Sequence, residues 1–160
     1  MREALLTINA IWFLFGATIY CGVMWALQFF FYPSWTAMNR ESVKDHFLVP
    51  IAAATRFFWV VVPLMLVSGV VMCITAWGDT PAFVAALVAL LGIIAIPAVG
   101  VVLIFPVNRI IKAGVADDAA LVPLLKRWMR LNSIRWILAT IMWGAAVWYI
   151  IAIGDFPHAV

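Results

Sequence analysis

Long blocks of apolar residues, with few charges inside them, dominate the hydrophobic pattern of the chain. A helix needs about 20 apolar residues to cross the hydrocarbon core of a bilayer, and four of the blocks are long enough. Within each block the apolar residues are continuous and do not alternate with polar ones, which excludes a membrane β-barrel. The pattern therefore predicts four transmembrane helices, at about 6–32, 52–77, 81–105 and 134–154.

The polar segments between these blocks predict how the helices are joined. Only a short turn around Gly78 separates the second block from the third, so these two helices should form an antiparallel hairpin. Asp79 or Thr80 can cap the third helix, and Pro81 suits its first position. The sequence thus predicts an all-α integral membrane protein, with residues 1–160 forming one antiparallel four-helix bundle.

The segment between the third and fourth blocks is longer and has its own signals. We expect Pro106 to bend the third helix and Gly114 to end it. Asp117 and Asp118 then favour the start of a helix, because acidic residues stabilise the first turn. We expect this helix to cover about 119–131, to lie on the cytoplasmic surface and to lead into the fourth span.

Composition and charge agree with a membrane protein and predict its orientation. The chain is 68% hydrophobic and 11% charged, whereas soluble domains are roughly half apolar and a quarter charged. Of the 10 Lys and Arg residues, only Arg2 belongs to the side that holds both termini. Because Lys and Arg near helix ends stay in the cytoplasm, we expect an integral protein of a bacterial inner membrane with both termini outside. The lipid bilayer is its expected partner, and the basic residues follow the bilayer and give no indication of nucleic-acid binding.

Polar residues inside the apolar blocks gather near the predicted cytoplasmic end. Intramembrane polar residues are costly and mark functional candidates. Trp128, Asn132 and Arg135 have helical spacing and share one face, turned away from the basic residues Lys126 and Arg130. A planar anionic group suits the guanidinium fork. We expect a pocket for a hydrophobic small molecule at this end, with aromatic walls from Phe30, Phe31, Tyr32 or Trp128, lined by Gln28, Arg56, Asn108, Asn132 and Arg135.

Other interpretations of these residues stay open. Gln28 and Asn132 also suit hydrogen bonding between helices, and Arg109 suits an anchor at the interface. Arg56 and Arg135 either pair with acidic residues of the loops or face lipid headgroups or an anionic ligand. No metal or cofactor is predicted, because His46 and His158 belong to opposite sides of the membrane and Cys21 and Cys73 are isolated.

Three stretches resemble a family of small four-span membrane proteins that includes the anthrone oxygenases. They are "FGATIYCGVMWALQFFFYPSW", "FPVNRIIKAG" and "LLKRWMRLNSIRW". The family tends to have an Asn at the end of its third helix and a Trp-x-x-x-Asn-x-x-Arg pattern at the start of its fourth. Here Asn108 matches the first feature, and Trp128, Asn132 and Arg135 match the second. The resemblance covers nearly the whole chain and implies the four-helix fold.

The resemblance also implies an activity. An anthrone-type oxygenase converts a phenolic substrate to a quinone with dioxygen and needs no cofactor. It needs a base and hydrogen-bond donors for the resulting oxyanion. His46 is the candidate base, since only His has an unperturbed pKa near neutrality, and the polar residues of the pocket are the candidate donors. The alternative is a non-catalytic accessory subunit of a larger membrane complex, with partner subunits, or a lipid- or quinone-binding module.

Overall fold

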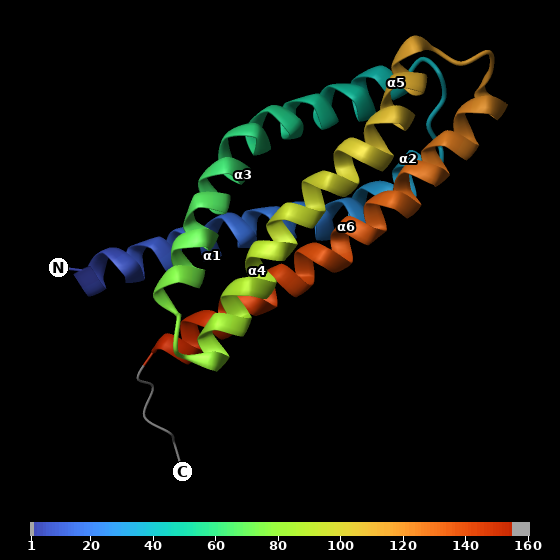
Figure 1. Ribbon diagram of the computed structural model, residues 1–160. Coiled ribbons are helices and arrows are strands. Elements are labelled where there is room, and N and C mark those ends of the chain that lie inside the picture. Colours follow the sequence, from blue (N-terminus) through green and yellow to red (C-terminus); the bar gives the residue numbers. More distant parts are fainter. Residues whose placement is uncertain (1, 155–160) are drawn as a thin grey trace.

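The computed structural model describes residues 2–154, and all the regular structure within them is helical (Figure 1). Three short stretches are π-helices, which have a wider turn than an α-helix and are labelled η. The elements in chain order are α1 (Arg2–Ala26), η1 (Leu27–Phe31), α2 (Tyr32–Trp35), η2 (Lys44–Leu48), α3 (Val49–Thr75), α4 (Thr80–Val99), η3 (Gly100–Ile104), α5 (Phe105–Ala113) and α6 (Asp118–Ile153).

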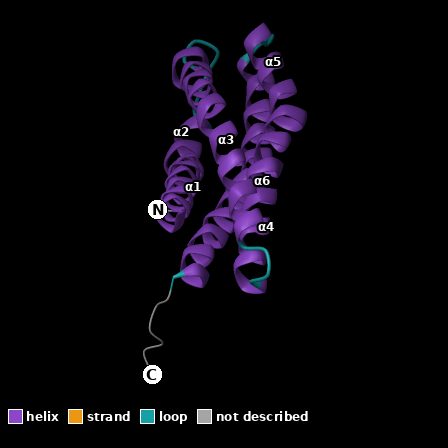
Figure 2. Cartoon of the chain, turned by 60° about the vertical axis from the view of Figure 1, so that its left-hand side comes forward, coloured by secondary structure: helices purple, strands orange, loops and turns teal. Residues whose placement is uncertain are grey.

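These elements join into four long rods that run up and down the molecule. The rods cover Glu3–Trp35, Lys44–Thr75, Thr80–Ala113 and Asp118–Ile153. α1 packs against α3 and α6, and α4 packs against the same two helices, so the rods surround one core. Figure 2 shows the same bundle from a second direction. The all-helical fold and the hairpin of the second and third rods are confirmed.

The predicted helix ends are also observed. The Asp79 side chain accepts a hydrogen bond from the backbone N–H of Ala82, which caps α4. The Asp117 side chain accepts one from the backbone N–H of Ala120 and caps α6. Gly114 follows α5 with a φ of +93°, a conformation that favours glycine because it has no Cβ. Local sequence therefore determines where these helices begin and end.

The segment predicted as a surface helix, 119–131, is helical but is not a separate element. α6 continues through it from Asp118 to Ile153 without a break. Its basic residues Lys126 and Arg130 are exposed, as the sequence predicts. Since Asp117 supplies the only cap and Pro123 lies in the first two turns of a long helix, nothing in the local sequence ends a helix before the fourth span begins.

Each π-helix is followed two residues later by a proline. Pro33, Pro50 and Pro106 stand at these positions after η1, η2 and η3. A proline ring clashes with the carbonyl four residues earlier in an α-helix and donates no hydrogen bond. In all three places that carbonyl belongs to the π-helix, whose wider turn makes room for the ring. The bend expected at Pro106 is therefore a local widening of the third rod, which continues to Ala113.

A fourth proline shapes the bundle differently. Pro63 lies inside α3 with no π-helix before it, and α3 bends about halfway along its length (Figure 1). Proline in a helix interior breaks the hydrogen-bond ladder and causes kinks. The second half of α3 packs against α1 and α4, and the axis of the first half runs in a different direction.

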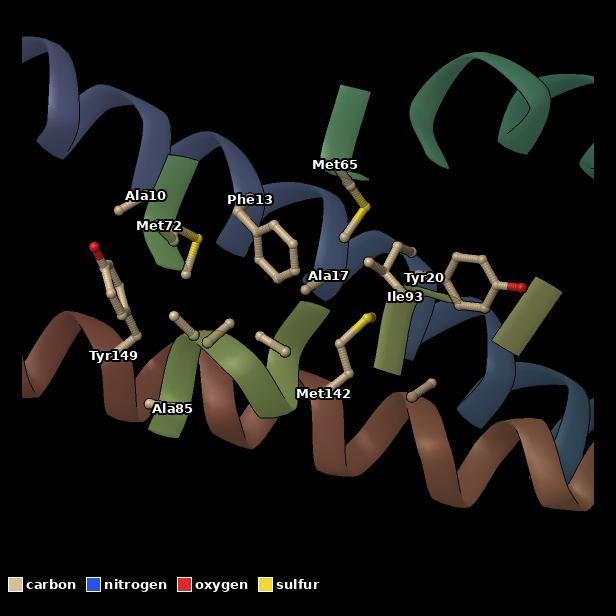
Figure 3. Packing of buried hydrophobic residues seen from close by; sticks show 14 of the residues in the cluster. Ala10, Phe13, Ala17, Tyr20, Met65, Met72, Ala85, Ile93, Met142 and Tyr149 are labelled. Atoms are coloured by element: carbon tan, nitrogen blue, oxygen red, sulfur yellow. The ribbon is translucent and has the colours of Figure 1, made fainter. Parts of the chain in front are cut away.

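The bundle has two clusters of buried side chains along its length. The first lies in the half that contains the α3–α4 turn and is built largely from small and flexible residues, among them Ala17, Met65 and Met142 (Figure 3). The second lies at the other end, near the long loops, and is aromatic, with Trp35, Phe47 and Trp128 at its centre. Small residues in the first cluster let helices approach closely, as in many membrane bundles.

The outer surface of the four rods is apolar. Trp59, Val67 and Val102 are each more than 60% exposed, and many other large apolar side chains are exposed around them. A contiguous apolar surface of this extent marks contact with a membrane or a partner. All four rods are long and apolar enough to cross a bilayer. The structure thus supports an integral membrane protein in contact with lipid.

Candidate functional site: a cavity lined by Arg135, Trp128 and Asn108

A cavity of about 340 Å³ lies between α1, α3, η3 and α6, at the junction of the two core clusters. Tyr20 and Met24 of the first cluster face it, as do Ile104 and Trp128 of the second. Most of the remaining wall is apolar, and α3 contributes half of its residues, on both sides of the Pro63 kink. None of the described residues lining it is acidic. A cavity of this size suits a small organic molecule.

Arg135 supplies the positive charge of this cavity, and two side chains hold its guanidinium. Its Nη1 donates to Asn132 Oδ1 over 3.0 Å, and its Nη2 donates to the Tyr20 hydroxyl. The guanidinium carbon also lies 5.7 Å from the centre of the Tyr20 ring, within the range of a cation–π interaction. The hydrogen-bond partners of Arg135 are therefore neutral groups, and of the alternatives left open by the sequence, pairing with a loop acid is not observed among the described residues.

Asn132 supports the arginine from behind and is completely buried. Its amide nitrogen donates to the Tyr32 hydroxyl over 2.6 Å and contacts the Met24 sulfur at 3.7 Å. Since its amide oxygen accepts from Arg135, both ends of the amide are used. Asn132 therefore connects α1 and α2 to the cavity arginine, and its role is to position Arg135.

Three polar atoms of the cavity's residues have no hydrogen-bond partner among the described residues. They are Arg135 Nε, Trp128 Nε1 and Asn108 Oδ1, and all three atoms are buried. The first two are donors and the third is an acceptor. Buried polar groups normally find partners, since leaving one unpaired costs about 1–3 kcal/mol. All three atoms belong to residues that line one cavity, which makes this cavity the candidate place for water or for a polar ligand.

The structure places the sequence-predicted residues in three different environments. Asn108 and Arg135 line the cavity, as expected, and Asn132 holds Arg135. Gln28 does not line it. Its amide oxygen accepts from the Ser133 hydroxyl over 2.9 Å on the other face of α6, so Gln28 joins two helices.

Arg56 and His46 also lie away from this cavity. Both side chains are exposed, and neither lines its wall. Arg56 lies on the outer face of α3, where an arginine can extend its charged group to the headgroups. His46 lies in η2 beside the buried Phe47, and neither residue lines the cavity. Of the residues expected to line one pocket, Gln28 and Arg56 do not line this cavity, and neither does His46, the candidate base.

The aromatic wall also differs from expectation. Phe30 and Phe31 are exposed on the outer surface, and Tyr32 lies behind Asn132. Trp128 does line the cavity. Sequence analysis missed Tyr20, whose hydroxyl lies against Arg135. A tyrosine in the middle of an apolar span is itself a signal, because its hydroxyl needs a partner there.

The described residues contain no group of three His, Cys, Asp or Glu side chains that could hold a metal ion. His158 lies outside them. Comparisons with protein families, curated proteins and solved structures found no match for the chain. The resemblance to the anthrone oxygenases rests on the three sequence stretches alone, and the class of the protein stands on its fold and its cavity.

Proposed function

We propose that the protein is a membrane-embedded binding protein for a small apolar molecule that carries a hydrogen-bonding oxygen. The observation that carries this proposal is the Arg135 guanidinium in the wall of an apolar cavity, where its hydrogen-bond partners are neutral groups. No acidic side chain lines this space among the described residues. A carbonyl, phenol or phenolate oxygen suits this charge, and the apolar wall contacts the body of the ligand.

Charge and packing support an oxygen-bearing ligand over a plain hydrocarbon. The Arg135 guanidinium has five N–H groups, and Asn132 and Tyr20 accept from two of them. Its other N–H groups attract an electron-rich oxygen, and hydrogen bonds from charged donors are the stronger kind. Gly100 brings the η3 backbone close to this group. A Cβ added there would lie 3.8 Å from the guanidinium carbon, so a larger side chain at this position would take space beside the charge.

The oxygenase implied by the resemblance would use the same donors to stabilise an enolate. It would also need a base at the reacting carbon. The candidate base, His46, is exposed and does not line the cavity. Binding is therefore the function that the geometry supports better, and the proposal includes no proton abstraction.

The test compares two probes that have the same carbon skeleton, of which only one carries carbonyl oxygens. 2-Methyl-1,4-naphthoquinone and 2-methylnaphthalene are titrated by calorimetry into the purified protein in lipid nanodiscs. We expect the quinone to bind more tightly. Arg135→Gln should weaken quinone binding about ten- to hundredfold, because a charged hydrogen bond contributes about 1.5–3 kcal/mol. Arg130→Gln, on the exposed face of α6, is the matched control and should bind as the wild type does.

A second variant keeps the test valid if Arg135→Gln unfolds. Gly100→Leu should fill the cavity next to the guanidinium and abolish binding of both probes. Gly22→Leu is its control, because Gly22 is exposed on α1 and a Cβ added there meets no atom within 4 Å. Equal affinity for quinone and hydrocarbon, or unchanged binding in Arg135→Gln and Gly100→Leu, would refute the proposal.

A further inference from the structure

At Trp128 the cavity wall meets a cluster of buried aromatic side chains at the loop end of the bundle. The rings of Trp35, Phe47 and Trp128 pack edge to face, with centroids 4.9 to 5.4 Å apart. All three side chains are buried, and Leu121 and Leu125 fill the space along α6 beside them. The three rings and two leucines form what we call the aromatic plug. The polar hollow at the loop end, which includes Arg40, Lys44 and Asp118, lies beyond it.

The cavity is open on a different side. Two residues of its wall, Trp59 on α3 and Val101 on η3, are 67% and 52% exposed. Their neighbours on the surface, Val60 and Val102, are apolar and still more exposed than Val101. Apolar residues this exposed in a membrane-spanning rod face hydrocarbon. The opening between the first half of α3 and η3 therefore leads into the bilayer.

Two features of the chain account for this opening. The kink at Pro63 redirects the first half of α3, and the residues from Ile51 to Pro63 form that side of the cavity. On the opposite side, η3 begins at Gly100, which has no side chain to cover the cavity. The unpaired donors of Trp128 and Arg135 lie on the far wall, on α6.

We infer that the site takes its ligand sideways from the hydrocarbon layer, through the opening between Trp59 and Val101, and not from the cytoplasm. This inference rests on the proposed function. This route implies a lipid-soluble ligand that enters with its polar end first. Its apolar part moves from the bilayer to the apolar wall of the cavity. Its polar end meets hydrogen-bond donors only on the far wall of the cavity. A water-soluble anion would have to cross the aromatic plug.

The position of Arg56 agrees with this route. It lies on α3 one helical turn before Trp59, toward the loops, and its side chain is exposed. An arginine on a lipid-facing surface extends its guanidinium to the headgroup level. The opening thus lies just inside the hydrocarbon layer, at the depth where amphipathic molecules with one polar end gather.

The experiment measures how fast 2-methyl-1,4-naphthoquinone associates with the protein in liposomes, by stopped-flow quenching of tryptophan fluorescence. Val101→Phe narrows the opening and adds no tryptophan. We expect it to slow association and dissociation together by about tenfold, a change within the range seen among variants of one site. Val102→Phe is the matched control, one residue along η3 and outside the cavity wall, and should leave both rates unchanged.

Two further measurements distinguish the routes. With lipid entry, the wild-type association rate follows the quinone concentration in the bilayer when the amount of lipid is varied; with aqueous entry, it follows the free concentration in water. Phe47→Ala weakens the aromatic plug and should leave the association rate unchanged. A faster rate in Phe47→Ala, or unchanged rates in Val101→Phe, would overturn the route while the proposed function stands. If the wild type does not bind the quinone at all, both fail.

Discussion

Arg135 Nη1 donates a hydrogen bond to Asn132 Oδ1, 3.0 Å away and one turn earlier in α6. The same asparagine donates to the Tyr32 hydroxyl, so its amide can neither rotate nor flip without losing a partner. Buried polar networks in which each member is satisfied fix a single arrangement. The hydrogen bond between Asn132 and Arg135 therefore holds the guanidinium in place, and the Asn132 side chain has little rotational freedom.

Asn132→Leu should disturb both stability and binding. The substitution leaves the Tyr32 hydroxyl and Arg135 Nη1 without their partner, and we expect a loss of about 1–2 kcal/mol in the free energy of unfolding. Quinone affinity should fall as well, because Arg135 loses its support. Thermal unfolding and calorimetry check the two effects. Ser133→Ala removes the hydroxyl that donates to Gln28 on the other face, and its quinone affinity should equal that of the wild type.

Asn108→Leu should stabilise the ligand-free protein. Its Oδ1 is buried and unpaired, so an apolar side chain of similar size removes a desolvation cost of about 1–3 kcal/mol. The same variant should bind 1-naphthol, which offers a hydroxyl hydrogen, less well than the wild type. Asn9→Leu provides the contrast. Asn9 Nδ2 donates to the Ser68 carbonyl over 3.2 Å, so this variant should melt at a lower temperature. A lower melting temperature in Asn108→Leu would mean that its oxygen has a protein partner.

Gly92→Ala should destabilise the bundle where α4 meets α6. A Cβ at Gly92 would lie 2.7 Å from the Met142 Cβ, next to the α6 backbone, so the helices must separate. Overpacking of this kind costs about 1–3 kcal/mol. Gly144→Ala adds the same methyl group to α6 where no atom lies within 4 Å, and alanine favours helix over glycine. We expect Gly144→Ala to melt no lower than the wild type; equal melting of the two variants would contradict the close packing.

The charge distribution predicts that both ends of the chain lie outside the cytoplasm. A reporter that is active only in the cytoplasm, fused after the last residue, should give no signal. The same reporter inserted after Gly114, between α5 and α6, should be active, because the exposed Lys112 and Lys126 flank that loop. Signal from the terminal fusion and none from the loop would invert the orientation and place the cavity near the opposite face of the membrane.

The sequence by itself determined the features that depend on neighbours along the chain. Hydropathy over about 20 residues was sufficient for the number of long apolar helices, and Asp79, Asp117 and Gly114 marked helix ends through local backbone chemistry. Helical spacing placed Trp128, Asn132 and Arg135 on one face, where the structure has them. Each of these properties involves groups within a few turns of one helix, so no knowledge of packing is needed.

Only the tertiary structure decided which polar residues meet. Tyr20 reaches Arg135 from another helix, although 115 positions separate them. Arg56 and Gln28 lie at a suitable depth and yet face away from the cavity. Depth follows from position along a span, but the direction a side chain faces depends on how each helix is rotated about its axis. Packing against three other helices and the kink at Pro63 determine that rotation, and neither is encoded in the local pattern.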